Sequence, residues 1–217
     1  GHNLMAPCRL RASSTPIVLK SQPDAVIEDI WLRVTTPGVP ALTCFDSPRV
    51  TIRRLRIEHA HDGVGIRFQR CHRIRISEVS ISAIDANLRP NRCQLPFHDC
   101  DNIHGIASLD VKIERVRVAG GSTGIELLNC KGAQLRSIVA LNVLGPYPRG
   151  QCVQFARSHG ARLDDFHCRN DASLSWPESY RRRSEKAPRW QRTRPSTFSG
   201  RWRSQTRARS GAATQAR

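Results

Sequence analysis

Apolar residues recur along the chain in the pattern apolar-x-apolar-x-x-apolar-x-apolar, where x is any residue. Six segments match this pattern, and their first residues are 25, 24, 37, 22 and 28 positions apart. In each half of the pattern alternate residues are apolar, which is typical of a short strand with one buried face. The matching segments are residues 25–32, 50–57, 74–81, 111–118, 133–140 and 161–168. A unit repeated in this way predicts a solenoid of stacked coils.

Each coil is predicted to hold three short strands. One more apolar pair precedes every match by eight and six positions, as Ile66 and Phe68 precede Ile74. The three-residue step inside each match interrupts the alternation, so a two-residue corner must lie there, as at residues 53–54. Equivalent corners are expected at residues 28–29, 77–78, 114–115, 136–137 and 164–165. Ser or Cys precedes the later matches by three positions, at Ser47, Cys71, Ser108, Cys130 and Ser158. This column supports the same register.

The spacing resembles the right-handed parallel β-helix of the pectate-lyase-like superfamily. The resemblance covers about residues 15–170 and rests on the apolar columns, not on a catalytic signature. It implies an all-β, right-handed parallel β-helix solenoid of about six coils. The alternative is a leucine-rich repeat, which requires Asn where this chain has Thr35, Ala60, Ile84 and Gly121, so we favour the β-helix. The inward residues are then predicted to include Ile52, Leu55, Ile57, Ile66, Ile76, Ile113 and Ile125.

The sequence divides into three parts. We expect a partial coil or cut end in residues 1–14, the β-helix in residues 15–178 and a disordered basic tail in residues 179–217. The tail carries 11 Arg, one Lys and one acid, and it has no Leu, Ile, Val, Met or Cys. A segment without aliphatic side chains buries too little surface to offset its chain entropy. Neither end carries a recognisable cap, so we expect a fragment of a longer β-helix.

Three interpretations of the basic tail remain open. Its Arg residues and its two Trp residues could form a nucleic-acid-binding arm. It could be a solvated segment with incidental affinity for polyanions. It could also be an out-of-frame translation product, since its composition is that of a misread GC-rich gene. Nucleic-acid binding is the interpretation that we least expect.

Charge and cysteine content indicate what the protein could bind and where it could be located. The net charge is +17, and residues 1–178 hold 23 basic and 17 acidic side chains, a charge of +6 that suits an acidic polymer. No apolar run approaches the ~20 residues of a transmembrane helix, so we expect no membrane span. Eight cysteines fit an exported protein, and the resemblance also implies an extracellular or periplasmic location. We expect a monomer.

Most cysteines occupy positions of the repeat. Cys44, Cys71, Cys130 and Cys168 fall in inward or small-residue columns, and Cys152 precedes an inward position. We expect them to be free thiols, since free Cys behaves as a small buried hydrophobe. The pair formed by residues 93 and 100 flanks an insertion and could bridge it. No C-x-x-C motif occurs, so a structural zinc site is not predicted.

The candidate chemistry lies in an outward column of the predicted sheet. In the superfamily that the chain resembles, substrate crosses the coils along the outer face of one sheet. Here that column reads Val18, Thr43, Arg67, His104, Glu126 and Gln154. We predict Arg67, His104 and Glu126 as catalytic residues, because a cation for a uronate carboxylate beside an imidazole and a carboxylate suits lyase or hydrolase chemistry. The alternative is an ordinary solvated face whose Arg and Glu form a weak ion pair.

Two loops beside this column supply candidate substrate-binding residues. An insertion runs into His104, and a second loop precedes Arg67. The predicted substrate-binding residues are His61, Asp62, His98, Asp99, Asp101 and Gln154. Spacing across loops does not establish that His59 and His61 bind a metal with His98 and Asp99, so we predict no metal site. No cofactor is indicated.

Two functions remain open from the sequence. In the first, the protein is a relative of polysaccharide lyases or glycoside hydrolases that acts on an acidic glycan. In the second, it is a non-catalytic β-helix that binds carbohydrate or serves as a structural surface module, a truncated fragment without activity. A fold does not choose between them, because function depends on the site.

Overall fold

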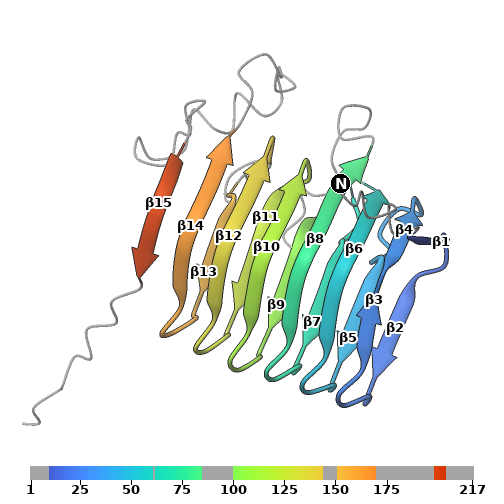
Figure 1. Ribbon diagram of the computed structural model, residues 1–217, viewed down its shortest axis with the longest axis horizontal. Coiled ribbons are helices and arrows are strands. Elements are labelled where there is room, and N and C mark those ends of the chain that lie inside the picture. Colours follow the sequence, from blue (N-terminus) through green and yellow to red (C-terminus); the bar gives the residue numbers. More distant parts are fainter. Residues whose placement is uncertain (1–9, 61, 85–99, 144–150, 170–197, 204–217) are drawn as a thin grey trace, which may run out of the picture.

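The computed structural model describes residues 10–60, 62–84, 100–143, 151–169 and 198–203. Every regular element among these residues is a strand, and no helix occurs in them. Strands of successive coils lie side by side and pair in parallel, so that they form two facing sheets (Figure 1). The protein is therefore an all-β parallel solenoid, a β-helix, as the repeat predicted.

Sheet 1 contains nine strands and sheet 2 contains six. The strands of sheet 1 are β1 (Arg11–Ser13), β3 (Val26–Glu28), β4 (Ile30–Val34), β6 (Thr51–Ala60), β8 (Arg75–Ile84), β10 (Lys112–Ala119), β12 (Gln134–Leu141), β14 (Arg162–Arg169) and β15 (Phe198–Arg203). Those of sheet 2 are β2 (Ile17–Lys20), β5 (Leu42–Phe45), β7 (Ile66–Gln69), β9 (Asp101–Ile106), β11 (Thr123–Leu128) and β13 (Val153–Ala156). The six strands of sheet 2 belong to about five complete coils of the solenoid. We expected about six coils, which is one too many.

The predicted corners are made by residues with positive φ. Arg54 (φ 53°), Glu78 (φ 55°) and Arg115 (φ 51°) each occupy the second corner position, although none of them is glycine. Charged side chains of neighbouring corners pair across the coils, with 2.7 Å from Arg54 Nε to Asp29 Oδ1 and 2.8 Å from Arg115 Nη2 to Glu78 Oε1. The two short strands predicted on either side of the corner run on as one bent strand from β6 onward.

The core consists of aliphatic columns between the two sheets. The predicted inward residues are all buried, with at most 3% exposure: Ile52, Leu55, Ile57, Ile66, Ile76, Ile113 and Ile125. In sheet 2 the register stacks Phe68, Gly105 and Leu127 in one inward column. A Cβ at Gly105 would overlap the Phe68 ring and lie 2.6 Å from Leu127 Cδ2, so glycine makes room for a large neighbour on either side.

The Ser/Cys column links the coils by polar contacts. Ser108 Oγ accepts a hydrogen bond from the Cys71 amide at 3.0 Å, and Ser158 Oγ accepts one from the Cys130 amide at 3.0 Å. Ser108 is fully buried. These hydroxyls therefore satisfy backbone donors of the preceding coil that water does not reach freely, which accounts for a small polar residue at this position.

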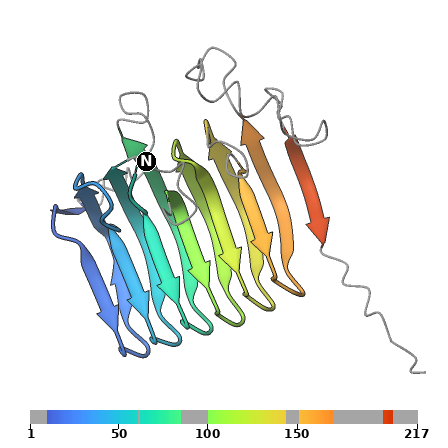
Figure 2. The same cartoon turned by 180° about the vertical axis from the view of Figure 1, so that it is seen from behind.

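One strand of the structure belongs to the predicted tail. Strand β15 pairs antiparallel with β14 at one end of sheet 1 (Figure 2). We expected disorder throughout residues 179–217, and these six residues instead add a strand, because the edge of β14 offers backbone partners that need no aliphatic side chain. The other residues of the predicted tail lie outside the described part. Among the described residues, no helix has the length and apolarity needed to cross a bilayer.

Candidate functional site

The outward column of sheet 2 is aligned by parallel register. Arg67 of β7 stands opposite His104 of β9, and His104 stands opposite Glu126 of β11. Thr43 and Gln154 extend the line on either side. Neighbouring strands lie about 4.8 Å apart, so the guanidinium, imidazole and carboxylate groups occupy consecutive positions on one face. The predicted alignment is confirmed, while the predicted roles stay hypotheses.

Asp101, His104 and Glu126 form a compact cluster on this face. His104 Nδ1 lies 2.8 Å from Asp101 Oδ2 and 3.8 Å from Glu126 Oε2. The side chains are 5%, 0% and 12% exposed for His104, Asp101 and Glu126 respectively. Because a carboxylate only accepts, the short contact assigns a proton to His104 Nδ1. Asp101 thus orients the imidazole, while its predicted role in substrate binding stays a prediction.

A second buried pair fixes the backbone beside this cluster. Asn102 Nδ2 donates to the carbonyls of Gly120 at 2.8 Å and Thr123 at 3.3 Å. Its Oδ1 then faces His59 Nε2 at 3.2 Å, and His59 belongs to β6 rather than to a loop. Both side chains are fully buried. Asn102 therefore ties sheet 1 to the start of β9, next to Asp101. Asn102 was not among the predicted site residues, because the sequence shows there only a single polar residue in a strand.

The cluster also has the donor set of a cation site. Asp101, His104 and Glu126 each offer one ligand atom, and these atoms lie within 4.8 Å of one another. Imidazole together with carboxylates suits divalent transition metals. We predicted no metal site from the sequence, where the residues considered as ligands were His59, His61, His98 and Asp99.

The remaining predicted site residues are not all in the described part. Residues His61, His98 and Asp99 lie outside it. Asp62 lies half-buried in the turn between β6 and β7, and half-buried Gln154 stands opposite Glu126 in the register. The structure thus brings Asp101 into contact with His104, one of the predicted catalytic residues. The substrate-binding roles of the other residues stay predictions.

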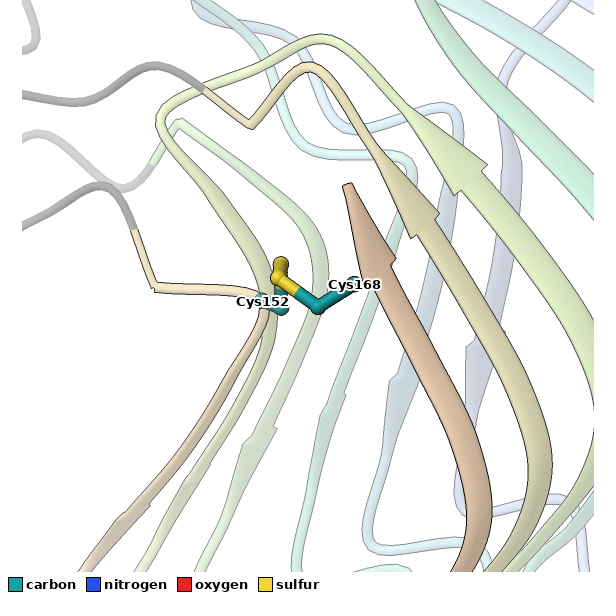
Figure 3. Close-up of a disulfide and its surroundings, with 2 residues drawn as sticks. All are labelled: Cys152 and Cys168. Carbon is teal, nitrogen blue, oxygen red and sulfur yellow. A yellow bond between two sulfur atoms is a disulfide. The ribbon is translucent and has the colours of Figure 1, made fainter. Parts of the chain in front are cut away.

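A disulfide corrects the prediction of free thiols for two cysteines. Cys152 and Cys168 are bonded, with their Cα atoms 6.0 Å apart (Figure 3). Cys168 belongs to β14 and points inward. Cys152 lies one residue before β13 begins, so the in-and-out alternation of that strand does not force its side chain outward. Cys100 is also disulfide-bonded, and Cys93, its suggested partner, lies outside the described residues.

Three other cysteines, all buried, carry no disulfide bond in the structure: Cys44, Cys71 and Cys130. Burial raises the pKa of the Cys130 thiol. A thiol whose ionisation is disfavoured is a poor nucleophile. Cys130 therefore acts as a small core residue and has no place in the chemistry of the site.

Comparison with known proteins finds no family model, no curated protein and no solved structure that matches this chain. The class that the fold defines is the parallel β-helix, with a polar cluster on the outward face of sheet 2. The geometry of that cluster is therefore what indicates a function.

Proposed function

We propose that the protein is a carbohydrate-active β-helix that cleaves an acidic polysaccharide, with the outward face of sheet 2 as its active site. The observation that carries this proposal is the hydrogen-bonded pair of Asp101 and His104 in line with Arg67. An imidazole oriented by a carboxylate is a common arrangement for a general base. A neighbouring guanidinium is suited to a uronate carboxylate.

Elimination fits the cluster better than hydrolysis. A glycoside hydrolase needs two carboxyl groups about 5 Å or more apart, on either side of the scissile bond. Here Asp101 and Glu126 both lie beside the same imidazole nitrogen, at 2.8 Å and 3.8 Å from His104 Nδ1. This arrangement suits a base and the group that positions it better than an acid and a nucleophile on opposite sides of a sugar. We therefore favour a polysaccharide lyase.

The proposed reaction assigns one role to each side chain. Arg67 pairs with the uronate carboxylate, which stabilises negative charge developing beside it as the adjacent C–H bond breaks. His104 accepts that proton through Nε2, because Asp101 holds the other ring nitrogen in the protonated state. The electron pair forms a carbon–carbon double bond and expels the glycosidic oxygen. Glu126, when protonated, can supply the proton that this oxygen requires.

An extracellular or periplasmic location belongs to the same proposal. The disulfide between Cys152 and Cys168 supports it, since disulfides persist in oxidising compartments. Acidic polysaccharides are also found outside the cell envelope.

The test is an activity screen of the full chain on pectate, alginate and chondroitin. A lyase produces unsaturated uronates, which absorb in the ultraviolet, whereas a hydrolase produces only new reducing ends. His104→Ala and Arg67→Ala should each lower the rate by about 100-fold or more. His167→Ala and Arg75→Ala, which replace the same residue types on sheet 1, should leave it unchanged. Glycan binding without turnover would instead identify a binding module, and equal rates in all four variants would place the chemistry elsewhere.

A further inference from the structure

Two buried thiols lie close together between neighbouring coils, on the inward side of sheet 2. Cys44 lies in β5, Cys71 follows β7, and neither is exposed to solvent. Their Sγ atoms are 2.6 Å apart. Non-bonded heavy atoms in a core sit about 3.5–4 Å apart, and a disulfide bond measures about 2.05 Å. The two sulfur atoms are therefore much closer to bonding distance than to ordinary packing distance.

We propose that Cys44 and Cys71 form a disulfide that joins two successive coils inside the core. The fold itself brings them together. Cys44 stands opposite Phe68 in the register of β5 and β7. The chain then turns at Arg70 (φ 53°), and this turn carries Cys71 back under Cys44, with its Sγ 3.2 Å from the Cys44 carbonyl oxygen.

A comparison within the same column separates this pair from an ordinary buried cysteine. Cys130 occupies the column position of Cys71 two coils further along, and its Sγ contacts the backbone carbonyl of Leu128 at 3.6 Å. The residue that corresponds to Cys44 in its neighbouring coil is Gly105, which has no side chain. Cys130 is therefore predicted to stay a thiol under conditions that oxidise the pair.

The chain already contains oxidised cysteines. Cys152 is bonded to Cys168, and Cys100 is disulfide-bonded as well. These bonds mean that the chain is exposed to an oxidant while it folds. The same oxidant would also oxidise Cys44 and Cys71 before the core closes over them. Within the pair, a hydrogen bond from Cys44 lowers the pKa of Cys71, so Cys71 is the thiol that ionises first.

The step is a thiol–disulfide exchange with a small disulfide oxidant such as oxidised glutathione. The Cys71 thiolate attacks one sulfur of the oxidant, forms a mixed disulfide and releases the first glutathione thiolate. The Cys44 thiolate then attacks Cys71 Sγ and expels the second glutathione thiolate. The protein loses two protons and two electrons, and the oxidant is reduced to two molecules of glutathione.

The experiment maps the bonds in the full chain, purified without reductant and denatured in N-ethylmaleimide. Trypsin should release residues 34–49 joined to residues 71–73, and reduction should separate the two peptides. Residues 118–131, which contain Cys130, should carry the maleimide and serve as the internal control. In Cys44→Ser, residues 71–73 should become labelled, and in Cys71→Ser, residues 34–49 should become labelled.

Maleimide on both Cys44 and Cys71 in the wild-type protein, after refolding with oxidised glutathione, would overturn the proposal. A bond from either residue to another cysteine would overturn it too. The wild-type peptide map decides the question even where a serine variant does not fold.

Discussion

At the scale of single residues, the turns after the strands of sheet 2 are made by residues that rarely take a positive φ. Ala107 follows β9 with φ 48°, and Arg70 follows β7 with φ 53°. An L-residue in this conformation costs about 1–2 kcal/mol relative to the right-handed region. Ala107 has no polar side-chain atom to offset that cost, although its amide donates to the Leu128 carbonyl at 2.9 Å.

Replacement of Ala107 by glycine should therefore stabilise the protein. Glycine adopts the left-handed conformation freely, and the gain should remain about 0.5–1 kcal/mol after the larger entropy loss of glycine on folding. Urea unfolding measures it. The matched control is Ala119→Gly in β10, where φ is not positive and a loss of about 0.5–1 kcal/mol is expected. A loss of stability in Ala107→Gly similar to that of the control would contradict this account.

At the scale of the element, β9 carries the proposed base on its outward side and a packing constraint on its inward side. Gly105 and His104 are adjacent, so one strand must satisfy both the core and the site. The Phe68 ring fills the space that a Gly105 side chain would need. Any shift of β9 away from Phe68 would also move His104 relative to Arg67 in the neighbouring strand.

Gly105→Ala should accordingly destabilise the fold by about 1–3 kcal/mol, the usual cost of overpacking a core. Phe68→Leu on the same background should recover part of that loss, because it frees the space that the new methyl group requires. A double-mutant cycle measured by denaturant unfolding gives the coupling between the two positions. Additive effects would mean that β9 moves as a whole instead of clashing with Phe68.

The sequence predicted the features that depend on the alternation of apolar and polar residues along a strand. Inward positions such as Ile52 and Ile113 follow from period-two patterning, and corners such as 53–54 follow from the three-residue step that breaks it. The Asp101–His104 contact could not be predicted in this way, because alternation puts residues three apart on opposite faces. The bond from Cys152 escaped prediction for a similar reason, since it lies before the strand begins.

At the scale of the whole molecule, ionic contacts are concentrated in the first coils. Among the described residues, four carboxyls have a pKa below the ordinary range, and each accepts a hydrogen bond from an arginine of the following coil. They are Asp24, Glu28, Asp29 and Asp46. Folding therefore favours the ionised form of these groups. Their stabilisation is present above their ordinary pKa of about 4 and is lost as the pH falls through and below it.

Acid should consequently loosen the solenoid from one end. Repeat structures hold together through contacts between neighbouring coils, so protonation of these carboxyls weakens β2 to β6 before it affects β10 and β12. Hydrogen exchange measured by mass spectrometry near pH 3 should show earlier loss of protection in residues 17–60 than in residues 112–141. Asp29→Asn, which removes one titrating group, should reduce the difference between neutral and acid pH. Simultaneous loss of protection in both segments would contradict this order.

The bond between Cys152 and Cys168 closes a ring within the last parallel coil that the structure describes. If the chain were pulled from the side of β14, tension would pass through the two sulfur atoms and bypass the backbone between them. The sequence separation of 16 residues corresponds to about 50 Å of extended chain. This length carries no tension while the disulfide is intact, so it does not add to the extension of the molecule. The proposed bond between Cys44 and Cys71 would remove a second and longer length in the same way. Under an applied force, the unfolded protein would therefore extend to a shorter length than its number of residues implies.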